Sequence, residues 1–389
     1  MKISFNYEPL VAMLSATSTV VEDAMSSEDL KNVIFKVSKE TKLVEVIGIN
    51  QLITYRQTPS SENYTLEVED DEFGTADALF MQIKSKELLG ALNVFKSMHK
   101  TKVTGVSLEN VENKVKIIIT EEEIDTSKEL RSGWKFDNIP VKPNTLPMIN
   151  LQMPVENRFT EESVKISLYV DSLLPIMTNG TNLYSKMVFS ENRVVAFNPA
   201  FTTLMNNSLS EVFRGFSLSY RAISFIKNVI CAIPIVTVAK TPQYLCFSAD
   251  GVEAFVRYDN KTADYSLYER LFTKDFAVVL DRQYFRDVLK RLSLASDAVE
   301  VKIEANADSI VVQNSKFSQS VPITNSKGLD ALGSVSFKVL PDVMNKAIIG
   351  DDSQFSNSVF MYFAPTQNGG YSLVFSDDSG FWFSVASIR

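Results

Sequence analysis

Residues 213–272 read FRGFSLSYRAISFIKNVICAIPIVTVAKTPQYLCFSADGVEAFVRYDNKTADYSLYERLF, and this stretch decides the fold. It opens with alternating apolar residues, as in a half-buried strand, and Ser219 is a suitable helix N-cap. Apolar residues then recur at helical spacing until Pro234 ends the helix. Three strand-like runs follow, at residues 235–239, 243–248 and 253–258. The stretch therefore predicts a strand, a helix and an antiparallel three-stranded meander.

The same strand–helix–meander pattern occurs six times, at intervals of about 50 to 85 residues. The helices are expected near residues 9–21, 85–95, 171–177, 219–233, 281–292 and 341–348. In the third copy, apolar residues alternate from Val164 to Leu168 and predict a strand, with Asp171 capping the helix. Asp281 and Pro341 are expected to open the last two helices.

The six copies pair naturally into three similar domains of an α+β protein. Four prolines without apolar periodicity mark a linker between the first two domains. The predicted boundaries are residues 1–140, a linker at 141–159, then 160–272 and 273–389. The alternative interpretation is one long β-sandwich array with incidental helices.

Composition indicates a soluble globular protein, with 45% hydrophobic and 22% charged residues in 389. No apolar run approaches the roughly 20 residues of a membrane span, and the N-terminus lacks a signal-peptide core. Cys231 and Cys246 are expected to be buried free thiols, which fits a cytoplasmic location. The net charge of −8 argues against a generic nucleic-acid coat but allows a local basic surface.

The sequence offers little to catalysis. His99 is the only histidine, and no phosphate-binding or nucleophile-elbow motif is present. Acidic clusters at residues 69–72, 121–125 and 351–352 are interpreted as solvated turns. We therefore predict no enzyme activity, no cofactor and no metal. A hydrolase with catalytic carboxylates that no motif marks is the alternative.

Basic residues on the polar helix faces are more informative. Four of the six predicted helices carry them: Lys86, Lys96 and Lys100; Arg221 and Lys227; Arg282, Arg286, Lys290 and Arg291; and Lys346. Arg282, Arg286 and Lys290 stand four residues apart and predict one stripe on the solvated face. Such surfaces suit the phosphate backbone without reading bases, although each helix alone also fits an ordinary solvated face. The first and third helices are expected to lack basic residues.

The six-fold pattern resembles the bacterial sliding clamp, the β subunit of DNA polymerase III, over nearly the whole chain. Four local stretches are also similar to that family: MKISFNYEPLVAML (1–14), SENRVVAFNPAFTTL (190–204), YDNKTADYSLYERLF (258–272) and FWFSVASIR (381–389). No single stretch is specific; the repeated pattern and its order carry the resemblance.

The resemblance implies the DNA-clamp fold and a homodimeric ring, with helices lining the hole and sheets outside. Such a ring encircles double-stranded DNA regardless of sequence, tethers the replicative polymerase as its processivity factor, and is placed by a clamp loader. The basic residues above would face the DNA. The ring would close near Leu292 and Leu294, where the first domain's second half meets the third domain. The family's partner-peptide pocket would have walls at Phe201, Thr202, Tyr268, Val385 and Ile388.

The chain departs from the family at that pocket. Residues 198–201 replace an Asp-Gly-His-Arg run, Ala263 stands at a frequent proline, and the tail ends Ser-Ile-Arg instead of being rich in methionine. A viral source, acting in the host cytoplasm, would fit such divergence. A clamp-fold or β-repeat structural protein that binds protein partners without encircling DNA is the alternative function.

Overall fold

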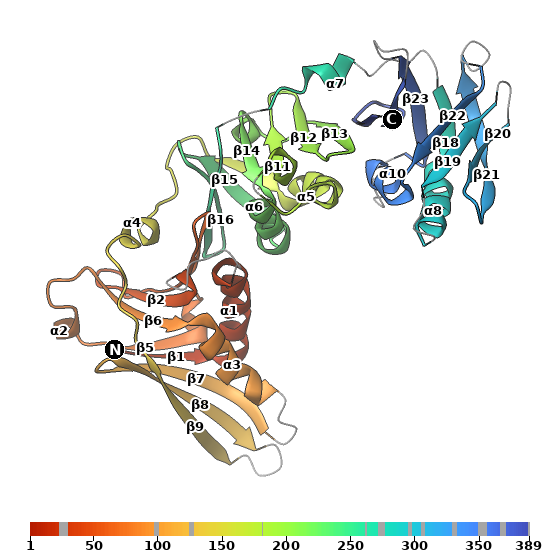
Figure 1. Ribbon diagram of the computed structural model, residues 1–389. Helices are drawn as coiled ribbons and strands as arrows, with labels where there is room; N and C mark the ends of the chain where they lie inside the picture. Colours follow the sequence, from red (N-terminus) through yellow and green to blue (C-terminus); the bar gives the residue numbers. More distant parts are fainter. Residues whose placement is uncertain are drawn as a thin grey trace. The chain divides into compact units, whose positions relative to one another are not determined.

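The computed structural model describes residues 1–22, 30–96, 101–123, 128–180, 182–260, 263–270, 277–294, 298–304, 308–328, 333–348, 356–365 and 371–387. It is an α+β structure, drawn in Figure 1. The predicted strand–helix–meander pattern appears six times in its element order. His99 and Lys100 lie outside the described residues.

Each copy contains one strand, one helix and three further strands. The first two copies are β1 (Lys2–Asn6), α1 (Tyr7–Val21), β2 (Asn32–Ser38), β3 (Val44–Ile49) and β4 (Ile53–Gln57); then β6 (Ala78–Lys84), α3 (Ser85–Lys96), β7 (Thr101–Val111), β8 (Lys114–Glu123) and β9 (Glu129–Asp137). The next two are β10 (Phe159–Glu162), α5 (Ser163–Leu173), β11 (Lys186–Phe189), β12 (Arg193–Phe197) and β13 (Phe201–Asn206); then β14 (Phe216–Ser219), α6 (Tyr220–Phe225) with the π-helix Ile226–Ile230, β15 (Ile235–Lys240), β16 (Tyr244–Ala249) and β17 (Val252–Arg257).

The last two copies are β18 (Ala277–Asp281), α8 (Arg282–Ser293), β19 (Val299–Ile303), β20 (Ser309–Gln313) and β21 (Ser318–Lys327); then β22 (Val335–Val339), α10 (Pro341–Ala347), β23 (Ser358–Pro365), β24 (Tyr371–Ser376) and β25 (Trp382–Ser387). Shorter connecting elements are β5 (Tyr64–Glu67), α2 (Asp70–Phe73), α4 (Leu146–Ile149) and α7 (Ser266–Arg270).

The chain forms two compact units, one of Met1–Ser163 with Asn228–Tyr258 and one of Val164–Lys227 with Asp259–Arg389. These units do not follow the domain boundaries predicted from the sequence, because the sheets cross those boundaries. The first unit has a five-stranded sheet, β5-β1-β7-β8-β9, and an eight-stranded sheet, β10-β15-β16-β17-β4-β3-β2-β6. The second unit has one twelve-stranded sheet, β14-β11-β12-β13-β25-β24-β23-β18-β21-β20-β19-β22.

Neighbouring copies exchange their first strands. β1 pairs with β7 of the second copy, while β6 pairs with β2 of the first. The same exchange joins β10 to β15 and β14 to β11, and then β18 to β23 and β22 to β19. Every pair of copies is therefore interlocked, which supports the pairing inferred from the sequence.

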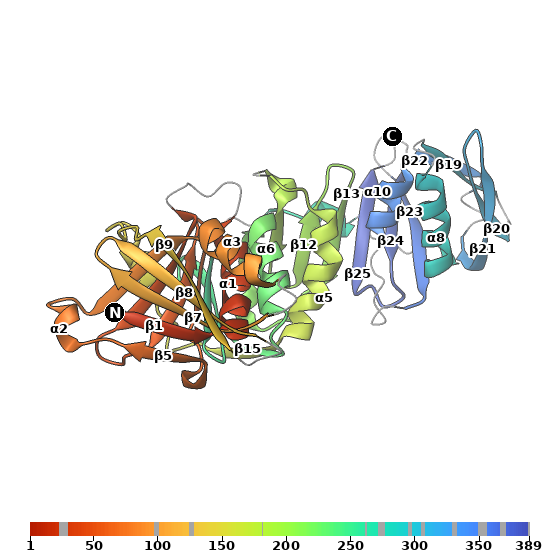
Figure 2. The same cartoon turned by 90° about the horizontal axis from the view of Figure 1, so that it is seen from below.

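The helices pair in the same way. α1 and α3 lie side by side in the first unit (Figure 1), and their apolar faces join the core that both of its sheets line. In the second unit α8 and α10 lie side by side in both views (Figures 1 and 2). The polar faces of these helices are left for solvent, as amphipathic spacing predicts.

The sequence predicts the start of a helix correctly where a short polar side chain caps it. The Ser219 side chain accepts a hydrogen bond from the backbone N–H of Ala222, and Asp281 accepts one from that of Tyr284 at 2.7 Å. Pro341 begins α10, where its missing N–H costs nothing. These three predictions are confirmed.

The prediction for the third copy is wrong. Residues 164–168 belong to helix α5, not to a strand, and Asp171 lies inside that helix rather than at its cap. The buried residues Ile166, Tyr169, Val170 and Leu173 follow helical spacing, whereas Val164 is exposed. A short run of alternating apolar residues fits both a strand and a helix. The helical spacing of the buried residues as far as Leu173 distinguishes the two.

Two further interpretations change. Residues 121–123 continue strand β8 instead of forming an exposed turn, and Glu121 is buried. Neither Cys231 nor Cys246 forms a disulfide; Cys246 is buried, as expected, but Cys231 is only half-buried. Burial, with a contribution from the Glu253 carboxylate, raises the pKa of the Cys246 thiol to about 12.

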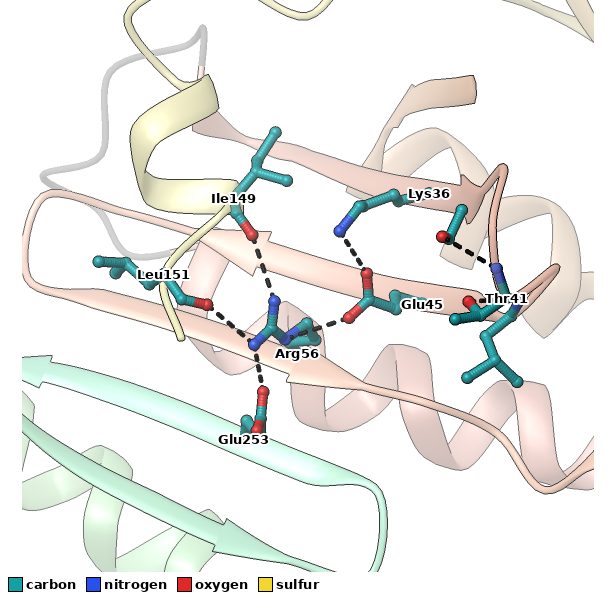
Figure 3. Close-up of polar contacts among 9 residues, drawn as sticks. Lys36, Thr41, Glu45, Arg56, Ile149, Leu151 and Glu253 are labelled. Atoms are coloured by element: carbon teal, nitrogen blue, oxygen red, sulfur yellow. Dashed lines mark hydrogen bonds and ion pairs between the residues drawn. The ribbon is translucent and has the colours of Figure 1, made fainter. Parts of the chain in front are cut away.

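The predicted linker is packed onto the first unit. Ile149 of α4 is buried against apolar residues of β2 and β3. The Arg56 guanidinium donates to the backbone carbonyls of Leu151, at 2.9 Å, and Ile149, and it forms ion pairs with Glu45 and Glu253 (Figure 3). Because β3, β4 and β17 supply these groups, one buried side chain joins the linker to strands from two copies.

Candidate nucleic-acid interface

Helix α8 carries the densest set of predicted DNA contacts. Its apolar side is buried, including Phe285, and Lys290 near its C-terminus is exposed. Arg286 is half-buried, and its Nε donates to Asn345 Oδ1 of α10 at 3.2 Å. Arg282, in contrast, is buried with 6% of its surface exposed. The prediction that Arg282 lies on the solvated face is wrong.

Helix α10 adds an exposed cation beside α8. Lys346 lies in its last turn, where the helix dipole favours a positive charge. Within the described part of the chain, neither Lys346 nor Lys290 has an ion-pair partner. The contact between Arg286 and Asn345 orients the guanidinium without cancelling its charge. The α8/α10 pair therefore presents net positive charge.

The α5/α6 pair is arranged differently. Lys227 is exposed in the π-helical turn after α6, and its Nζ lies 2.7 Å from Asp171 Oδ1 on α5. Asp171 Oδ2 accepts a hydrogen bond from Ser167 Oγ at 2.8 Å. Arg221 is half-buried and already interacts within the structure. Lys227 is thus matched by an anion.

The remaining predicted contacts lie on α3, and one cation was missed. Lys86 is exposed on α3, and Lys96 is its last residue. Lys165 is exposed on α5, so the third helix does carry a basic residue. The prediction of a strand at residues 164–168 hides Lys165, which lies on the exposed side of α5. Helical spacing through Leu173 was the signal that could have found it.

The expected peptide pocket falls where β13 pairs with β25. Phe201, Thr202 and Val385 are buried in that sheet junction. Tyr268 of α7 is half-buried and meets Phe197 edge-on, with ring centroids 6.3 Å apart. Further half-buried aromatic side chains pack on the same cluster: Tyr184, Tyr265 and Phe360. Ile388 lies outside the described residues.

The two leucines predicted at the ring interface differ. Leu292 is 1% exposed and belongs to the buried side of α8. Leu294, just after the helix, is 87% exposed. Leu292 is therefore core within its own chain, and of the two leucines only Leu294 offers surface to a second copy.

Among the described residues, no three His, Cys, Asp or Glu side chains are grouped to hold a metal ion. No helix in the described ranges is both long and apolar enough to cross a membrane.

No protein-family model and no curated protein matches this sequence. Solved structures do match: the DNA polymerase β subunit of Streptococcus pyogenes, 13% identical, has a TM-score of 0.75 over 100% of both chains. The DNA polymerase sliding clamp of Bacillus subtilis, 12% identical, gives 0.75 over 100% of this chain and 99% of its own. The DNA polymerase III β subunit of Thermotoga maritima, 14% identical, gives 0.71 over the same shares.

These likenesses define the class of fold. The chain has the DNA-clamp fold over its full length, as the resemblance implied. It is similar to DNA polymerase III β sliding clamps in structure while sharing little of their sequence.

Proposed function

We propose that this protein is a DNA sliding clamp, a non-catalytic processivity factor. Two copies close head-to-tail into a ring around duplex DNA, with the paired helices facing the hole. The ring tethers a replicative polymerase in the cytoplasm after a clamp loader has placed it. The three-domain division at residues 1–140, 160–272 and 273–389 is part of this proposal, each domain being one interlocked pair of copies.

The observation that carries the proposal is the order of the sheet junctions. β4, the last meander strand of the first copy, pairs with β17 of the fourth. β13, the last meander strand of the third copy, pairs with β25 of the sixth. In both cases the odd copy of one domain joins the even copy of the next.

The third junction of this series is open within the chain. By the same rule, β21 of the fifth copy would join β9 of the second. In the described residues β9 pairs only with β8, and residues 318–322 of β21 pair only with β20. Unpaired edges of this kind favour strand addition. A second copy supplies both partners, and a head-to-tail contact that closes generates a ring.

Charge distribution supports DNA as the occupant of the ring. The chain carries −8 overall, yet the polar faces of α3, α8 and α10 present exposed lysines: Lys86, Lys290 and Lys346. Positive side chains attract phosphates without reading sequence, which a sliding protein requires. Lys96, Lys100, Arg221, Arg286 and Lys227 complete the proposed set.

The aromatic cluster around Tyr268 and Phe197 is the proposed contact for polymerase and loader peptides. Half-buried aromatic rings such as Tyr268, packed against buried sheet residues, are good anchors for short linear segments. Removing Ile388 and Arg389 should weaken peptide binding while leaving the fold intact. Unchanged affinity in that truncated protein would exclude the tail from the site.

The assembly can be tested by changing one exposed side chain. Leu294→Asp should reduce the mass measured by light scattering at micromolar concentration from about twice 43.6 kDa to that of one chain. The single chain should stay folded, with an unchanged circular dichroism spectrum, because Leu294 is 87% exposed and lies outside the core. Leu340→Asp, also at an exposed leucine but next to α10, is the matched control and should leave the dimer intact. A wild-type protein that is a strict monomer or a trimer contradicts the proposed ring.

A further inference from the structure

We infer that Asp171 is a positioning residue that holds Lys227 away from DNA and so weakens the grip of the ring. The inference rests on the proposed function. Lys227 Nζ and Asp171 Oδ1 are 2.7 Å apart, and both side chains are close to half exposed. Solvent can therefore reach the pair, and a phosphate can compete for the lysine.

The carboxylate is built to stay in place. Ser167 precedes Asp171 by one helical turn and donates to Oδ2 at 2.8 Å, leaving Oδ1 for Lys227. The partner comes from a different helix, since Lys227 lies in the π-helical turn Ile226–Ile230 that follows α6. Such turns often mark functional positions in helices. Two helices thus fix an anion beside a lysine on the face assigned to DNA.

The lysines proposed to contact DNA therefore differ in how readily they can bind a phosphate. Lys290 and Lys346 are exposed without an ion-pair partner in the described residues, so they are ready for phosphates. Lys227 must first leave Asp171, and each contact it makes with DNA leaves that carboxylate unpaired near the phosphates. An exposed ion pair is weak, so the lysine is restrained and not removed. A ring that must slide benefits from such restrained contacts because firm ones would slow it.

The test compares Asp171→Asn with the wild-type protein on a short fluorescent duplex, by anisotropy from about 50 to about 200 mM NaCl. Asparagine keeps the shape and the bond from Ser167 but releases Lys227. We expect affinity at low salt to rise about twofold to fivefold and the log–log salt slope to steepen by about 0.9. Adding Lys227→Gln to Asp171→Asn should remove the steepening, because no released lysine remains.

Asp342→Asn is the matched control, since Asp342 is an exposed carboxylate in the first turn of α10 without an ion pair among the described residues. The inference is overturned if Asp171→Asn changes affinity and slope no more than Asp342→Asn does. It is also overturned if the full gain persists beside Lys227→Gln. Lys290→Gln tests the proposed function separately from the inference about Asp171. If the wild-type protein binds DNA and Lys290→Gln lowers its affinity, the proposed function stands whatever the result for Asp171→Asn. No DNA binding by the wild-type ring defeats both.

Discussion

The helix pairs α5/α6 and α8/α10 occupy equivalent places in the repeated pattern but treat charge differently. Between α5 and α6 the contact is an ion pair, Lys227 with Asp171. Between α8 and α10 it is a hydrogen bond from Arg286 to the neutral side chain of Asn345. One contact cancels a positive charge and the other keeps it, although both orient a cation.

This difference shows that equivalent helices need not contribute equally to a shared surface. If DNA passes along these faces, Lys290 and Lys346 of α8/α10 can meet phosphates directly, whereas Lys227 must first leave Asp171. Cations on one helix also differ, because Arg282 lies on the predicted basic stripe of α8 and yet is buried. Of the predicted stripe on this helix, Arg282 therefore contributes to stability, whereas Arg286 and Lys290 are the proposed DNA contacts.

The largest expected effect is on the stability of the protein and concerns buried Arg282. Arg282→Ala should lower the free energy of unfolding by on the order of 1–3 kcal/mol, because it removes a buried, interacting side chain. Arg291→Ala, at an exposed arginine of the same helix, should stay within about 0.5 kcal/mol. Thermal denaturation of both variants measures the difference. Equal midpoints would mean that Arg282 is not a structural residue.

The next effect is on DNA binding by α8/α10. Replacing Lys290 and Lys346 together with glutamine should flatten the log–log salt slope by about 1.8 and lower affinity on the order of tenfold at low salt. The mass of the particle should not change, since both side chains are exposed. Anisotropy with a short duplex gives the slope. An unaltered slope would remove these lysines from the interface.

The smallest effect is expected from α5/α6. Lys227→Gln alone should change affinity by less than about twofold, because the lysine is already paired. Lys290→Gln alone, as the matched single change, should flatten the slope by about 0.9. Titrations of the two variants in parallel decide the comparison. A loss with Lys227→Gln as large as with Lys290→Gln would contradict the proposed ranking of the helix pairs.

Much of the fold could be predicted because its signals are local. Ser219 and Asp281 cap helices through their own side chains, and Pro341 begins α10 whatever surrounds it. The repetition of the pattern then fixed the number of copies and their pairing. The third copy failed because residues 164–168 are too short a stretch to distinguish a strand from a helix.

The site was less predictable because it depends on what lies opposite each side chain. Spacing along α8 placed Arg282 in line with Arg286 and Lys290 but could not show that Arg282 would be covered. The pairing of Lys227 with Asp171 joins two helices far apart in sequence. The open edges of β9 and β21 become visible only once the strand exchange is known.

The central claim is that the ring encloses DNA, and topology tests it most directly. Wild-type protein is loaded onto a nicked circular DNA by its own clamp loader, cross-linked to close the subunit contacts, washed in high salt to remove protein held only by charge, and then treated with a restriction enzyme that cuts the circle once. The account predicts that cross-linked protein stays on the intact circle and leaves when the circle becomes linear. Equal retention on circular and linear DNA would contradict encirclement, even with the clamp fold in place.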